Sequence, residues 1–389
     1  MSNIETPESY DFWCAMWALG VRVGKGMYVN RPHSPVFCNW YIILAAESGT
    51  TRKSTAVNTI ARIAADLSVS NPHSIITGKT SPEALEILLH EQTRDCGKAV
   101  ASFAAPELAT VLGKEGYMST MPALLTDLYE CPEFRTNPGT LRSGMITQRD
   151  VYINFLSAST PAWLVTSINP TVIEGGFTSR VMFVVENDRK KSVAWPSPRH
   201  IKDLMEIRDA FDILGKYNKP IEISSGALKK YTTWYNKRTK PSDPYMSSFE
   251  AREDDHVLRT ACCLCINDGI LEIQTKHITN AIAVIQNVKE GAYKLFGGTF
   301  SESSRISDAV TKVREVLMEV GADGIKHTSL LRRVQTRINS RELKVLIKIL
   351  HESGMIQMFE LTRGGKIYRA TRAKEKFGIV TDVLKKMNV

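Results

Sequence analysis

The sequence has no long hydrophobic run, no low-complexity segment and no internal repeat. Its longest apolar stretch, Trp40–Ala46, is far shorter than the roughly 20 residues that a membrane-spanning helix requires. The N-terminal stretch is polar and lacks the pattern of a secretory signal peptide. We therefore expect a cytoplasmic protein with no membrane partner.

Cysteine is scarce as well, with seven in 389 residues. An odd number without metal-type spacing indicates reduced thiols rather than a disulfide framework or a zinc site. Cys262, Cys263 and Cys265 lie in the apolar run LRTACCLCIND, which predicts core packing rather than a metal site.

Positive charge is unevenly distributed along the chain, whose formal net charge is +9. Residues 301–389 contain 18 Lys and Arg against 10 Asp and Glu, whereas the preceding 300 residues contain 32 against 31. This asymmetry is typical of a nucleic-acid-binding arm, and a basic tail that favours solubility is the alternative.

Buried-strand patterns alternate with helical patterns in the first half of the chain, which predicts an α/β domain with a parallel sheet. The strand-like runs are Trp40–Ala46, Ala99–Ala105, Val151–Ser157 and Val181–Glu186. After Glu186 the pattern predicts helices only, over residues 200–215, 224–238, 249–268 and 275–294.

The last segment predicts three helices followed by a glycine-tipped hairpin, which is the layout of a winged helix-turn-helix. The helices are expected at 308–320, 327–335 and 340–353. The hairpin strands are expected at Met355–Leu361 and Lys366–Ala370.

The stretch LAAESGTTRKST has the composition of a phosphate-binding loop, in which a buried strand leads into a turn and then a helix. The ATP-binding residues predicted here are Gly49, Thr50, Thr51, Arg52, Lys53, Ser54 and Thr55. The motif GxxxxGK[ST] would place glycine at 47 and 52, where this sequence has Glu47 and Arg52. An ordinary turn that contains Lys-Ser is the alternative.

Three further residues follow or precede strands in positions that suit ATP hydrolysis. Glu107 follows a strand and suits activation of the attacking water, and together with Ser54 it would hold Mg²⁺. Thr160 would orient that water or sense the γ-phosphate, and Arg180, on the turn GGFTSR, suits an arginine finger. The alternatives are a helix cap, a turn residue and a solvated arginine.

In order and spacing these motifs resemble an AAA+ ATPase. Lys53-Ser54, Glu107, Ser159-Thr160-Pro161 and Ser179-Arg180 resemble the MCM-type helicases, and more closely a group of phage and plasmid replication ATPases. The stretches IEISSGALKKYTTWY and DDHVLRTACCLCI resemble the helical lid of these proteins. The resemblance covers roughly residues 10–370.

The resemblance implies an organisation and a set of roles. It implies a P-loop ATPase core over 1–190, a helical lid over 191–298 and a winged helix-turn-helix over 299–389. Lys53 and Ser54 would bind phosphate and Mg²⁺, Glu107 would activate water, and Thr160 would be sensor 1. Arg180 would act on the neighbouring subunit, and Arg259 would be the sensor-2 arginine.

Further implications concern cofactors, partners and location. ATP and Mg²⁺ are the expected cofactors, and a homo-oligomeric ring, a hexamer, is expected in a bacterial host cytosol. A separate primase or initiator would be a partner. Two departures from the family pattern affect ATP hydrolysis: the loop has one extra residue between Gly49 and Lys53, and Pro106 replaces an acid that supports the metal.

Basic residues near predicted turns and on one helix face are the candidate DNA contacts. By resemblance, Arg142 lies on a hairpin that would enter a central channel, and Lys114 lies on a second loop. Arg341, Lys344 and Lys348 share one face of the expected recognition helix, and Arg363 and Lys366 flank the wing. A surface hairpin and a protein-binding winged helix are the alternatives.

Three hypotheses follow. The first is an ATP-driven ring helicase or translocase that acts on single- or double-stranded DNA in phage or plasmid replication. The second is an ATP-switched initiator or helicase loader that binds DNA without unwinding it. The third is a winged-helix regulator whose nucleotide fold has decayed.

Overall fold

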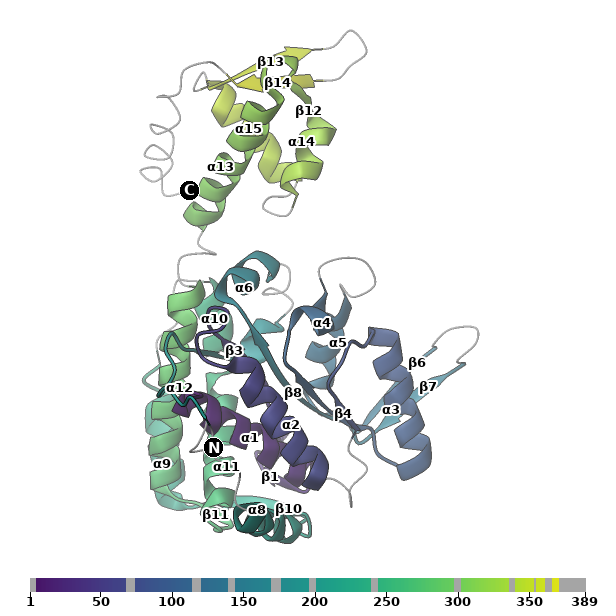
Figure 1. Cartoon of the computed structure of the whole chain (residues 1–389), viewed down its shortest axis with the longest axis vertical. Helices are drawn as coiled ribbons and strands as arrows, with labels where there is room; N and C mark the ends of the chain where they lie inside the picture. The colour runs from purple at the N-terminus through teal and green to yellow at the C-terminus, as the bar shows by residue number, and fades with distance from the viewer. Residues whose placement is uncertain are drawn as a thin grey trace. The chain divides into compact units, whose positions relative to one another are not determined.

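The structure is a computed structural model of the chain, and it forms two compact units, Met1–Leu295 and Phe296–Val389 (Figure 1). The residues that it describes are 5–67, 74–113, 120–138, 144–168, 176–195, 201–238, 244–296, 302–335, 340–352, 355–360 and 366–370. The division of the chain into core, lid and winged helix-turn-helix at residues 190 and 298 stays a prediction.

A five-stranded parallel sheet is the centre of the first unit, with the strand order β4-β5-β8-β3-β9. The strands are β3 Tyr41–Ala45, β4 Ser74–Ile76, β5 Val100–Ala105, β8 Tyr152–Ser159 and β9 Val181–Val185. Four of them overlap the strand-like runs of the sequence, with ends that differ by at most two residues, and β4 is an additional outermost strand. The expectation of an α/β domain with a parallel sheet is confirmed.

Side chains of β3 alternate between two buried faces of this sheet, which explains its continuous apolar run. Ile42 and Leu44 pack with α1 (Glu8–Val23) and α2 (Lys53–Leu67), which lie next to each other on one face (Figure 1). On the other face, the Tyr41 hydroxyl donates a hydrogen bond of 2.8 Å to the Leu125 carbonyl of α5 (Met121–Leu128).

The remaining elements around this sheet are helices and one antiparallel hairpin. They are α3 Pro82–Cys96, α4 Ala109–Leu112, α5 Met121–Leu128, β6 Phe134–Asn137, β7 Ile146–Arg149 and α6 Pro161–Ser167. Strands β6 and β7 pair in antiparallel register, so the hairpin expected ahead of β8 is present. Its tip, with Arg142, lies outside the described residues.

The prediction that only helices follow Glu186 is wrong, because two strands of that segment join a second sheet in the order β11-β10-β1-β2. The strands are β1 Met27–Val29, β2 Val36–Phe37, β10 Lys219–Ile223 and β11 Glu272–Ile273. Strand β10 pairs in parallel with β1, nearly 200 residues earlier in the chain. Strands this short have no periodicity of their own, and their partners are distant in sequence.

The helices of this segment lie close to where the sequence predicts them. They are α8 Ile201–Leu214, α9 Ser225–Tyr235, α10 Pro244–Glu250, α11 Glu253–Asn267 and α12 Thr275–Phe296. The side chains of Cys262, Cys263 and Cys265 on α11 are buried in the hydrophobic core, as expected. No helix within the described ranges is long and apolar enough to cross a membrane.

The second unit combines three helices with a three-stranded antiparallel sheet in the order β12-β14-β13. The elements are α13 Glu302–Val320, β12 Ile325–Lys326, α14 His327–Val334, α15 Ser340–Glu352, β13 Ile356–Glu360 and β14 Lys366–Ala370. The expected helices and hairpin are present, and β12 adds a short strand. Leu330, Leu343, Leu350 and Tyr368 are buried in its separate core.

Candidate nucleotide site

Two residues of the loop between β3 and α2 have left-handed backbone conformation: φ is +77° at Gly49 and +56° at Arg52. Glycine adopts this conformation freely, whereas a residue with a side chain does so at a cost of about 1 kcal/mol. Arg52 occupies the place of the second glycine of the phosphate-loop motif. The loop therefore has a glycine-type backbone at position 52 although the residue is arginine.

Contacts from the N-terminal segment hold this loop in place. The Arg52 Nε donates to a Glu5 carboxylate oxygen at 2.7 Å, and the Val193 backbone N–H donates to the other oxygen at 2.9 Å. These two hydrogen bonds lower the pKa of Glu5. The Tyr10 hydroxyl donates to the Ala45 carbonyl at 2.9 Å, and Thr51 is buried beside it.

Lys53 is the first residue of α2, and its ammonium group lies over the loop. The Nζ donates to the Ala46 carbonyl at 2.6 Å and to the Glu47 carbonyl at 3.0 Å. Partial burial lowers the pKa of Lys53, while the negative charges of Glu107 and Glu47 act in the opposite direction. Ser54 and Thr55 follow in the first helical turn with exposed side chains. Their backbone N–H groups belong to the end of a helix that attracts anions.

Glu107, Thr160 and Lys53 all lie at the edge of the sheet that is formed by the carboxyl ends of its parallel strands. Glu107 follows β5, and Thr160 follows β8, which is the strand between β5 and β3. Residues Ser157 and Ser159 of β8 pair with Ile43 and Ala45 of β3. The strands are parallel, so their carboxyl ends meet at one edge, which is where open α/β sheets bind ligands. Thr160 caps α6 by accepting a hydrogen bond of 3.3 Å from the Trp163 N–H.

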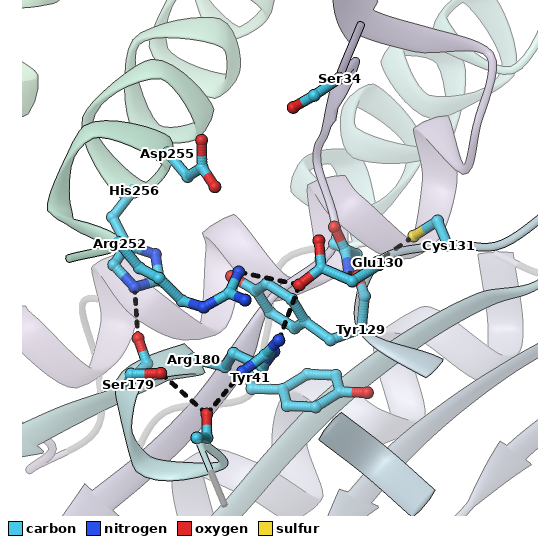
Figure 2. Close-up of polar contacts among 12 residues, drawn as sticks. Ser34, Tyr41, Tyr129, Glu130, Cys131, Ser179, Arg180, Arg252, Asp255 and His256 are labelled. Carbon is cyan, nitrogen blue, oxygen red and sulfur yellow. Dashed lines mark hydrogen bonds and ion pairs between the residues drawn. The ribbon is translucent and has the colours of Figure 1, made fainter. Parts of the chain in front are cut away.

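Arg180 lies at the opposite edge, which is formed by the amino ends of the same strands. It immediately precedes β9, and the first residue of β9 pairs with Tyr41, the first residue of β3. Figure 2 shows its guanidinium group between a carboxylate and the turn that precedes it. The group donates to Glu130 at 2.8 Å and to the Gly176 carbonyl at 2.7 Å. It also lies over the ring of Tyr129, and Arg180 is 9% exposed.

A second arginine meets the same carboxylate oxygen. Arg252, just before α11, binds Glu130 Oε1 at 2.8 Å, while the Glu130 side chain is 54% exposed (Figure 2). Burial lowers the pKa of Arg180, and the nearby positive charge of Arg252 lowers it further. The site thus has two guanidinium groups directed at one partly solvated anionic oxygen.

Arg259 is buried at this second edge, away from Lys53. Its Nε donates to the Phe37 carbonyl at 2.7 Å, and its guanidinium group lies 5.6 Å from the ring centroid of Trp40. Phe37 and Trp40 precede β3, and a five-residue strand is roughly 16 Å long. Burial lowers the pKa of Arg259 to about 10. The structure therefore separates Arg259 from the loop between β3 and α2 of its own chain.

Several residues of these two edges carry no sequence motif. Glu5 and Tyr10 support the loop from the N-terminal segment, while Tyr129, Glu130 and Arg252 surround Arg180. Glu130 lies in an ordinary Leu-Tyr-Glu-Cys stretch, and its partners are about 50 and 120 residues away. Only the fold reveals these contacts.

The candidate DNA-binding residues are described in part. Lys114, Arg142 and Arg363 lie outside the described residues. Arg341, Lys344 and Lys348 are exposed on α15, and Lys366 is exposed at the start of β14. Lys344, Lys348 and Lys366 line one cavity in the second unit.

Comparisons with known proteins do not identify a family for this chain. No protein-family model and no curated protein matches the chain. One matching solved structure is the Aeropyrum pernix ORC2 protein in complexes with ADPNP and ADP, at 10% identity and a TM-score of 0.27, over 98% of this chain and 94% of that chain. A TM-score this low does not establish a common fold, so the functional argument depends on the geometry above.

Proposed function

We propose that the protein is an ATPase of the AAA+ type that assembles into a ring and translocates on or unwinds DNA, in the replication of a phage or plasmid. The observation that supports this proposal best is that the candidate residues are divided between the carboxyl ends and the amino ends of the parallel strands. Lys53, Glu107 and Thr160 gather at one edge, while Arg180 lies at the other, where it cannot reach a nucleotide bound by its own chain. An arginine finger that acts on a neighbouring subunit needs no contact with the nucleotide of its own chain.

Different residues of the chain would bind the phosphates, hold the metal and activate the attacking water. The first turn of α2 and Lys53 would bind the phosphates, and Mg²⁺ would neutralise charge on them. Magnesium needs only one or two protein ligands beside phosphate and water, so Ser54 and Glu107 suffice. Glu107 would orient the attacking water and accept its proton, and the Thr160 hydroxyl, which accepts a hydrogen bond from the Trp163 N–H, would donate one to that water or to the γ-phosphate.

ATP hydrolysis by variants tests this assignment. We expect Glu107→Gln to lower DNA-stimulated ATPase activity roughly 100-fold or more, because it removes a general base. Arg180→Ala is expected to lower the activity on the order of 1000-fold, as loss of an arginine finger does. Arg94→Ala is the matched control, because Arg94 is exposed on α3 and, within the part of the chain that the structure describes, its ion pair is with the adjacent Asp95.

Mixing of inactive variants tests whether Arg180 acts on a neighbour. Subunits with Lys53→Ala keep Arg180, and subunits with Arg180→Ala keep the phosphate site. A mixture of the two would regain part of the activity if each site is shared between subunits. Unchanged inactivity in mixtures that demonstrably co-assemble would contradict a shared site.

A nucleotide-controlled initiator or helicase loader is the second candidate function. Pro106 stands beside Glu107 where an acid commonly supports the metal, which favours slow hydrolysis and a switch-like role. A forked DNA substrate separates the candidates: strand displacement supports the helicase, whereas DNA-stimulated ATPase activity without displacement supports the switch. In both cases the second unit would bind DNA as a winged helix-turn-helix.

A further inference from the structure

The second unit contains a hollow of about 770 Å³ between the start of α14, helix α15 and strands β13 and β14. Its volume lies in the range of sites that bind nucleotide-sized ligands. Ile347 and Tyr368 are almost fully buried beneath it, and Met358 is half-buried. The hollow therefore has an apolar floor.

Exposed lysines surround this floor. They are Lys326, Lys344, Lys348 and Lys366. Glu352 is the one acidic residue among the described lining residues, and its carboxylate lies 3.9 Å from the ammonium group of Lys348. Four lysines against one glutamate leave a charge of +3 while the histidines are neutral. A ligand that fits must combine negative charge at its periphery with an apolar centre.

His327 supplies a polar group inside the hollow. Its Nδ1 is hydrogen-bonded to the Tyr368 hydroxyl at 3.0 Å. Its Nε2 is buried and has no hydrogen-bond partner among the described residues. Burial and the positive charges of Lys344 and Lys366 lower the pKa of His327. The ring therefore forms part of the wall of the hollow, with one nitrogen bonded to Tyr368 and the other below the surface.

We propose that this hollow binds single-stranded DNA, with an unpaired base on the floor formed by Ile347, Met358 and Tyr368. The surrounding lysines bind the phosphates on either side of that base, and His327 forms part of the wall beside it. This proposal specifies the form of DNA that the proposed function requires. A base in a duplex is stacked and paired, so it presents only its edges to a protein and cannot enter a hollow. An unpaired base offers an apolar face, and its flanking phosphates match the lysines.

Binding of oligonucleotides with and without bases tests the proposal. The full-length protein is titrated, without nucleotide and at constant salt, into a fluorescent oligothymidylate, an equally long abasic oligonucleotide and a duplex of the same length. Anisotropy gives each Kd. We expect the abasic strand, which has the same phosphates, to bind on the order of tenfold more weakly than oligothymidylate.

Substitutions at two adjacent residues test whether the preference for oligothymidylate over the abasic strand arises at the floor of the hollow. Met358→Glu places a negative charge on the floor, and Phe359→Glu makes the same change at an exposed neighbour whose side chain points to the opposite face of β13. Met358→Glu is expected to abolish the difference between oligothymidylate and the abasic strand, whereas Phe359→Glu preserves it. Thermal unfolding of both variants confirms that they are folded.

Three results would overturn the proposal. Equal affinity of the wild type for oligothymidylate and the abasic strand would indicate a site for phosphates alone. If the duplex binds more tightly than oligothymidylate, and Lys344→Ala weakens that binding, α15 would be recognising a groove of the duplex. Displacement of the oligonucleotide by polyglutamate at equal charge concentration would indicate an acidic protein partner. ATP hydrolysis measured without DNA, for the wild type and Glu107→Gln, requires no binding in this hollow, so failure of one proposal is distinguishable from failure of the other.

Discussion

At the scale of single residues, the left-handed backbone at Arg52 makes the free energy of unfolding depend on which residue occupies position 52. Glycine removes the cost of that conformation, while the ion pair with Glu5, made by a half-exposed side chain, contributes little to stability. We expect Arg52→Gly to leave the free energy of unfolding unchanged or raised by up to about 1 kcal/mol. Arg52→Val should lower it by about 2 kcal/mol, because a β-branched residue is strained there.

Urea denaturation measures both changes. Arg189→Val is the matched control, since Arg189 also pairs with Glu5 and does not have a positive φ. Equal losses for Arg52→Val and Arg189→Val would show that the ion pair, rather than the backbone, determines the effect.

His256 predicts a pH dependence of stability near Arg180. Burial lowers its pKa to about 4 from 6.5, and its Nε2–H donates to the Ser179 carbonyl at 2.9 Å. Between pH 6.5 and 4 the unfolded chain binds a proton at His256 that the folded chain does not. The free energy of unfolding therefore falls as pH falls through this window, by up to about 3 kcal/mol.

Replacing the imidazole isolates this contribution. His256→Gln should flatten the dependence between pH 6.5 and 4.5, as measured by urea denaturation at several pH values, since all other titrating groups are shared with the wild type. Parallel curves for the two proteins would contradict the buried neutral histidine.

At the scale of elements, Arg259 joins α11 to the segment that precedes β3. Its guanidinium group is buried against Trp40 and Tyr129 and donates to the Phe37 carbonyl. Removal leaves that carbonyl without its donor and creates a cavity, so Arg259→Ala should lower the free energy of unfolding by about 3 kcal/mol. A sensor arginine would instead lower ATPase activity while stability stayed constant.

Arg252→Ala provides the comparison for this prediction. Arg252 precedes the same helix, but its partner Glu130 is largely exposed, so the expected loss is below about 1 kcal/mol. Thermal unfolding and ATPase activity measured on both variants distinguish a structural arginine from a functional one. An unchanged melting temperature for Arg259→Ala would refute the structural role.

At the scale of the whole molecule, the two edges of the main sheet predict self-association. The loop between β3 and α2 and Arg180 lie at opposite edges. If they form one ATP site, as proposed, that site would join different surfaces of two copies, and repeated contacts of this kind would close into a ring. We expect multi-angle light scattering to show a larger mass with ATP than without it. Lys53→Ala should remove the ATP-dependent increase, whereas Arg94→Ala should retain it. A monomer under both conditions would argue strongly against the shared site.

Much of the local organisation was predictable from the sequence. The run WYIILAA and the following Lys-Ser predict β3, its loop and α2, because a doubly buried strand and a helix start leave local patterns. The same holds for the three helices and the hairpin of the second unit. The candidate residues Lys53, Glu107 and Thr160 follow from their places after strands, and the fold brings them to one edge.

Other features depend on contacts between residues far apart in the chain. Strand order places β8 between β5 and β3, and the pairing of β1 with β10 inserts the later segment into the first unit. The meeting of Arg180 and Arg252 on Glu130 and the burial of Arg259 are equally non-local. The sequence by itself determined where the long helices and the longer buried strands form, since periodicity and turn chemistry are local properties, whereas the short strands β1, β2, β4, β10, β11 and β12 left no pattern of their own. Only the tertiary structure decided which edges and side chains meet, because pairing and burial depend on partners that no local pattern records.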